Sequence, residues 1–224
     1  MAPLAGLAPD LLAALASVAM IGAYYLFLLK KSKADPTYSI HGVNELARTL
    51  WVIGVMTQPG KDVMAVQTLR NFIMGSSLMA STASLLIIGT LTLSGQTENI
   101  ARSWHVLSLV GTHAAELWML KVICLLITFI VAFFAFAMSV RLANQVLFML
   151  NVPEPEAHPS LSPRAVAGRM NRAGNLFSIG MRSFFFAIPL VFWLFGPAFL
   201  VAASAGLVHI LYRIDRSDAA IDID

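Results

Sequence analysis

Long apolar segments alternate with polar connectors along the chain, and four of these segments are long enough to cross a bilayer as helices. They are predicted at residues 11–29, 72–93, 117–140 and 184–210. A hydrocarbon core about 30 Å thick needs about 20 apolar helical residues. The strands of a membrane β-barrel would alternate in polarity, and these segments do not. The pattern therefore predicts an all-α, polytopic membrane protein with four transmembrane helices.

The connectors at 30–71 and 141–183 are predicted to contain amphipathic helices that lie in the membrane interface. Apolar residues from Ile40 to Gly54 recur at helical spacing, and Trp51 suits an interfacial anchor. The alternative is a helix packed on the protein's own spans. In the second connector, Ser162-Pro163 precedes a basic helix that could lie against anionic headgroups. The alternative is that the basic residues of this helix serve only as a positive-inside topology signal.

Composition narrows the protein class. Hydrophobic residues make up 58% of the 224 residues and charged residues 12%, whereas soluble domains carry about 25% charged residues. An ordinary soluble domain, a disordered chain and a nucleic-acid binder are thereby excluded, and a single membrane domain over residues 1–224 is predicted. Cys124 is the one cysteine, so no intramolecular disulfide or cysteine-based metal site is possible. No metal is predicted.

Charge placement predicts the orientation of the spans. Most of the 15 Lys and Arg residues lie in the two long connectors. Positively charged loops stay in the cytoplasm, so both connectors are predicted to be cytoplasmic. With four spans, both termini are then external, or periplasmic, in a multi-pass protein of the cell (inner) membrane.

Three blocks of sequence resemble a known membrane family. They are AVQTLRNFIMGSSLMASTASLLIIG at 65–89, SVRLANQVLFMLNVP at 139–153 and WLFGP at 193–197. The chain resembles the family catalogued as "domain of unknown function 599" over roughly residues 20–212. The resemblance implies a four-helix membrane protein. It implies no established activity, substrate or cofactor.

Polar side chains gather at the predicted inner ends of three spans. Because buried polar groups must find partners, they could form one hydrogen-bonded cluster. One interpretation is a structural clamp with lipid-headgroup contacts, and the other is a dedicated site for an anion, a lipid, a quinone headgroup or a partner. The candidates are Gln67, Arg70, Asn71, Arg141, Asn144, Gln145 and Arg182.

The predicted outer side has four polar candidates: His113, Glu116, Lys121 and His209. Lys121 lies inside a span, where a charge points to function, although a satisfied structural ion pair is the alternative. The two histidines on different spans could hold a b-type haem or a metal. Two histidines are a weak signal, so no cofactor is predicted, and haem or quinone remains an alternative.

Ser76, Ala80 and Ser84 form a row of small residues four apart, which allows helices to approach closely. A polar permeation path is the alternative. A serine nucleophile would need a His/Asp partner, and none is recognisable nearby. The absence of a catalytic motif weighs against an enzyme.

These features favour a structural or accessory integral membrane protein, a subunit of a larger assembly. The alternatives are a small oligomeric channel or transporter, and a haem- or quinone-binding redox subunit. The expected partners are the lipid bilayer, anionic phospholipids and other membrane proteins or a second copy, with no nucleic acid.

Overall fold

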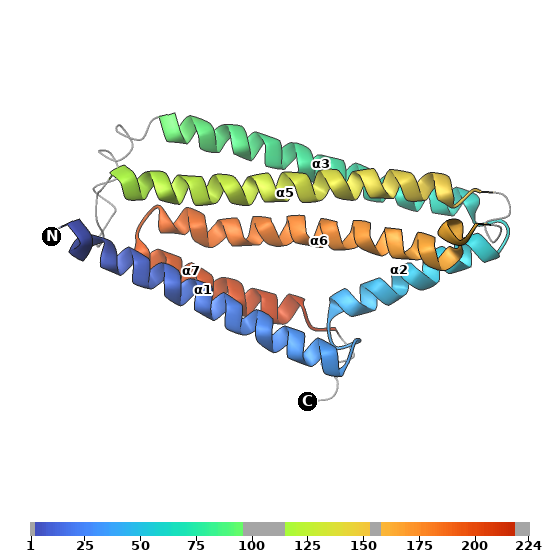
Figure 1. Ribbon diagram of the computed structural model, residues 1–224, viewed down its shortest axis with the longest axis horizontal. Coiled ribbons are helices and arrows are strands. Elements are labelled where there is room, and N and C mark those ends of the chain that lie inside the picture. Colours follow the sequence, from blue (N-terminus) through green and yellow to red (C-terminus); the bar gives the residue numbers. More distant parts are fainter. Residues whose placement is uncertain (1–2, 96–114, 153–157, 218–224) are drawn as a thin grey trace. The chain divides into compact units, whose positions relative to one another are not determined.

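The computed structural model describes residues 3–95, 115–152 and 158–217, except for the side chains of 3–7 and 115–116, and it is built of helices (Figure 1). In chain order they are α1 (Pro3–Ala34), α2 (Ile40–Thr57), α3 (Asp62–Gly95), α5 (Ala115–Met149), the short 3₁₀ helix η2 (Pro159–Leu161), α6 (Pro163–Trp193) and α7 (Pro197–Ile214). The predicted all-α class is confirmed.

Five of these helices are long and apolar enough to cross a membrane: α1 from Ala8, α3, α5 from Leu117, α6 and α7. The chain is therefore a multi-pass membrane protein by the length and composition of its helices. The predicted single span at 184–210 is wrong, because α6 ends at Trp193 and α7 begins at Pro197. Gly196 has a φ of 144°, and Pro197 lacks the N–H that would continue the helix. The chain turns here instead of kinking.

The fold divides into two compact units. Unit 1 comprises residues 1–40, 85–130 and 183–224, and unit 2 comprises residues 41–84 and 131–182. Helices α3, α5 and α6 each contribute residues to both units. The predicted single membrane domain stays a prediction.

In unit 1, α1 and α7 pack along each other and run in the same direction (Figure 1). Ala13 of α1 shares a buried cluster with Leu200, near the start of α7, and Leu28 shares another with Leu211, near its end. The last turns of α6 pack against α5, where Ala187 lies with Leu125 and Phe129.

The C-terminal ends of α1 and α7 are joined by backbone hydrogen bonds. The amide of Ile40 donates to the carbonyl of Asp215, and the amide of Ser217 donates to the carbonyl of Tyr38. Residues 38–40 and 215–217 therefore lie together. The turn after Trp193 adds a reversal that the four-span interpretation lacked, and the predicted orientation of the connectors and termini stays a prediction.

Unit 2 packs α2 against α3, α5 and α6. Val52 and Val55 of α2 are buried in its core with Leu69 of α3. The remaining buried members of this core are Ala65, Val146, Leu150, Val166, Ala167 and Met170. Thus α2 packs on the protein's own helices, one of the two predicted alternatives, while Leu46 and Leu50 stay exposed on it.

Candidate functional site

A buried ion pair joins α1 to α5 in unit 1. The ammonium nitrogen of Lys121 lies 2.7 Å from Oδ1 of Asp10, and the two side chains are 8% and 1% exposed. Both residues belong to helices apolar enough to span a membrane. Charged side chains are costly there and mark functional positions by default.

Trp193, the last residue of α6, completes this site. Its indole N–H donates to Oδ1 of Asp10 at 2.9 Å, and its backbone carbonyl accepts from the Lys121 ammonium at 3.2 Å. The ammonium also lies 5.3 Å from the centre of the indole ring. A helix C-terminus favours a cation, so the turn that ends α6 places a suitable carbonyl at Lys121. These bonds offset part of the cost of taking both charges out of water.

One oxygen of the site is left over. Lys121 and Trp193 both bind Oδ1 of Asp10, whereas its buried Oδ2 has no hydrogen-bond partner among the described residues. A buried, unpaired carboxylate oxygen is costly. It can take up a proton, or a hydrogen bond from a water molecule.

Two buried hydroxyls continue from Asp10 along the contact between α1 and α7. Ser17 is 3% exposed and Ser204 is fully buried, and in the described part of the chain neither Oγ has a partner. Ser17 follows Ala13 by one helical turn, and Ser204 follows Leu200 by one turn. Because Ala13 and Leu200 share a cluster and the helices run parallel, the two serines come at the same level.

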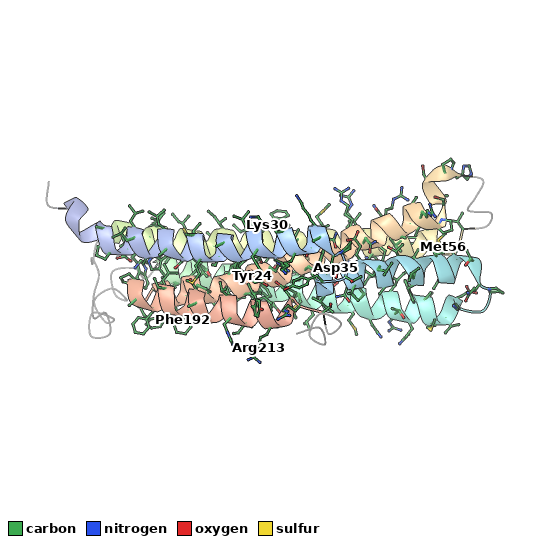
Figure 2. All side chains as sticks on the ribbon, turned by 90° about the horizontal axis from the view of Figure 1, so that it is seen from below. Tyr24, Lys30, Asp35, Met56, Phe192 and Arg213 are labelled. Carbon is green, nitrogen blue, oxygen red and sulfur yellow. The ribbon has the colours of Figure 1, made fainter. Side chains whose placement is uncertain are left out.

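The opposite end of this contact carries a second buried carboxylate. The Tyr24 hydroxyl donates to Oδ2 of Asp215 at 2.8 Å, and Asp215 is 5% exposed. Figure 2 shows Tyr24 in the space between α1 and α7. Asp10, Ser17 and Tyr24 are spaced by seven residues, which keeps them on one helix face. We call Asp10, Ser17, Ser204, Tyr24 and Asp215 the polar row.

The polar row is long on the scale of a membrane. Asp10 and Tyr24 are separated by 14 residues of continuous helix, about 21 Å at 1.5 Å per residue, against a hydrocarbon core of about 30 Å. A protonated carboxyl group, a hydroxyl group and a phenol group can each both donate and accept a hydrogen bond. The row therefore holds the kind of side chain that proton relays use.

Of the predicted outer candidates whose side chains the structure describes, Lys121 lies in this site and His209 does not. His209 is exposed on α7. His113 and the side chain of Glu116 lie outside the described residues, so the proposed histidine pair is untested. Among the residues that are described, no group of three His, Cys, Asp or Glu residues is arranged to hold a metal ion.

The predicted inner candidates lie in unit 2 and are not brought together. Arg182 is partly buried, whereas the other candidates are exposed. Asn144 donates to the carbonyl of Val140, one turn earlier. No hydrogen bond joins these candidates to one another in the described ranges. Their predicted contact with a lipid, an anion or a partner stays a prediction. The exposed members are Gln67, Arg70, Asn71, Arg141, Asn144 and Gln145.

The predicted small-residue row lies in unit 2 and is partly buried. Ser76 is fully buried, and Ala80 and Ser84 are half-buried. The Ser84 hydroxyl donates to the carbonyl of Ala80 at 3.2 Å.

Sequence reasoning missed Asp10 and Trp193. The first predicted span begins at Leu11, so Asp10 falls just outside it. The seven-residue spacing from Asp10 through Ser17 to Tyr24 was the available signal. Nothing local marked Trp193, because its role depends on the turn that follows it.

Comparison with known proteins gives one match. A family model described as "Protein of unknown function, DUF599" matches residues 12–220. That stretch includes Lys121 and Trp193 and begins two residues after Asp10. No curated protein and no solved structure matches the chain.

Proposed function

The chain belongs to the DUF599 family, whose function is unknown, and on the geometry of its polar row we propose that it passes protons through unit 1. The observation that carries this proposal is the Asp10–Lys121 pair, a desolvated carboxylate with one oxygen unpaired, at the head of a row of buried hydroxyls. Of the interpretations drawn from the sequence, this favours the channel or transporter.

The proton is the species that suits the row. Its members are almost fully buried, and they carry hydroxyl and carboxyl groups that can exchange a proton with a neighbouring water molecule. Successive members of the polar row on α1 are seven residues, or about 10 Å, apart, which is too far for a proton to pass directly from one to the next. Water bound at the unpaired hydroxyls of Ser17 and Ser204 would bridge them, since buried water binds where polar groups lack partners.

Each residue of the ion pair has a distinct role in this proposal. Oδ2 of Asp10 accepts the proton, which neutralises the carboxylate and weakens its attraction to Lys121. The ammonium keeps its charge and stays bound to the carbonyl of Trp193. When the proton leaves Oδ2 toward Ser17, the ion pair forms again.

We also propose an orientation. Lys31, Arg213 and Arg216 gather where α1 and α7 end, beside the joined residues 38–40 and 215–217. Positively charged ends stay in the cytoplasm, so this end faces inward and the start of α1 faces outward across the cell membrane.

Proton flux into liposomes tests the function. Purified protein is reconstituted with a trapped pH-sensitive dye, and a potassium diffusion potential drives proton entry. The wild type should acidify the lumen faster than empty liposomes do. Asp10→Asn should slow this flux by about tenfold or more, the effect of about 1.4 kcal/mol on a barrier.

Serine variants in the two units distinguish a loss of the proton path from a general loss of stability. Ser17→Ala combined with Ser204→Ala removes the middle of the row without touching a charge. Ser76→Ala removes another buried hydroxyl that has no hydrogen-bond partner among the described residues, but this one lies in unit 2. The first variant should lose flux and the second should keep it.

A structural or accessory role gives different results. Wild-type liposomes would then acidify no faster than empty ones, or folded Asp10→Asn and the double serine variant would both match the wild-type rate. Either result contradicts the proton path.

A further inference from the structure

Arg48 of α2 reaches across to α6 within unit 2. Its Nε donates to Oδ1 of Asn171 at 3.0 Å, and its Nη2 donates to Oδ1 of Asn175 at 3.3 Å. The side chain is half-buried. The two asparagines lie one turn apart on α6 and present their amide oxygens to the same guanidinium.

The guanidinium is held in one orientation. Nδ2 of Asn171 donates to the Thr49 hydroxyl at 2.7 Å, which fixes the amide so that its oxygen faces Arg48. The group also lies against Gly174, where a Cβ would come within 2.6 Å of Cζ of Arg48. Any side chain at 174 would push the guanidinium aside.

The positive charge of this group is not neutralised by a direct partner. No carboxylate within the described ranges lies at ion-pair distance from Arg48, and both of its hydrogen-bond acceptors are neutral amides. Burial lowers the pKa of Arg48, while the charge of Glu45, one turn earlier, raises it. Arg172 follows Asn171 in the sequence and is exposed on α6.

The donors of Arg48 are only partly used. A guanidinium has five N–H groups, and the bonds to Asn171 and Asn175 use one from Nε and one from Nη2. Three remain, including one on each Nη, and this edge matches two oxygens of a phosphate. The amides therefore position the group without saturating it.

We propose that Arg48, positioned by Asn171 and Asn175, binds a phosphate group in ester linkage. The proposal concerns unit 2 and does not depend on the proton path. A phospholipid is one available source, because the chain has five helices that are long and apolar enough to cross a membrane. A small soluble phosphate ester is the other source.

Thermal unfolding of the full chain in a neutral detergent tests the site. Phosphatidylglycerol, phosphatidylcholine and glycerol 3-phosphate are added separately, and the rise in Tm is recorded against concentration. Wild type should respond to phosphatidylglycerol at the lowest concentration. Arg48→Gln should need about tenfold more, because a hydrogen bond to a charged group is lost. Arg164→Gln is the control: it removes an exposed charge from α6, the helix that carries Asn171 and Asn175, and this variant should respond as wild type does.

Two further variants cover a failure of Arg48→Gln to fold. Arg48→Lys keeps the charge but lacks the two-pronged edge, and Gly174→Ala displaces the guanidinium; both should weaken the response. A response to glycerol 3-phosphate equal to that to the lipid identifies a soluble source. Equal responses of wild type and Arg48→Lys, or no response to any probe, overturn the proposal.

Discussion

The hydroxyl of Tyr24 donates to a carboxylate oxygen of Asp215, 2.8 Å away and 191 residues later in the chain. This bond, with the one from the Ser217 hydroxyl to the carbonyl of Thr37, ties the end of α7 to the end of α1. Two consequences can be measured, one for topology and one for stability.

The first consequence is that the start of the first connector and the C-terminus lie on one side of the membrane. A tag inserted after Asp35 and a tag fused after Asp224 should report the same compartment, because the seven residues after Ser217 are too few to recross a core of about 30 Å. A tag ahead of Met1 should report the opposite one. Labelling with a membrane-impermeant reagent checks this, and opposite results for the first two tags would contradict it.

The second consequence is that Tyr24→Phe destabilises the protein by about 1–3 kcal/mol, since it leaves the buried Asp215 carboxylate without this donor. Tyr212→Phe is the control. Tyr212 is exposed, and its hydroxyl accepts from Arg216, so the change should cost under about 0.5 kcal/mol. Unfolding in detergent gives both values. Equal losses of unfolding free energy for the two substitutions would mean that the bond from Tyr24 to Asp215 does not contribute to stability.

Helix type and membrane class could be predicted from this sequence because both follow from local apolar periodicity and length. The reversal at Gly196-Pro197 could not be told from a kink. Glycine followed by proline is compatible with a reversal and with a kink. Which of the two forms depends on whether residues 197–214 can pack against another helix. These residues pack against α1, whose partner face at Tyr24 and Leu28 is distant in sequence.

The candidate site was only partly predictable for the same reason. Lys121 stood out because a charge inside an apolar run is rare. Its partner Asp10 sat at the edge of another run, and the carbonyl of Trp193 is a backbone group with no sequence signature. The exposed polar residues at 67–71 and 141–145 looked alike in pattern, although the described structure does not join them. A periodic pattern identifies a shared helix face but does not say which helix covers it.

The ion pair should behave as a unit in stability. Asp10→Asn leaves a buried ammonium without its counter-charge, and Lys121→Met leaves a buried carboxylate; each should cost about 3–5 kcal/mol. Combining the two removes both charges, so the double variant should regain much of the loss. Unfolding in detergent measures the coupling, and strictly additive losses would show that the two groups do not interact.

Two glycines of α6 should respond oppositely to alanine. At Gly180 a Cβ would lie 2.6 Å from the Phe136 ring, which is fully buried and also contacts Phe177 at 5.5 Å between ring centres. The ring therefore cannot move aside freely, and Gly180→Ala should cost about 1–3 kcal/mol by overpacking. At Gly168 a Cβ would meet nothing within 4 Å, so Gly168→Ala should stabilise α6 by up to about 1 kcal/mol through helix propensity. Thermal unfolding of both variants in one detergent compares them directly, since propensity favours alanine equally at each position. Stabilisation at both would show that Phe136 yields and that α5 and α6 do not meet closely at Gly180.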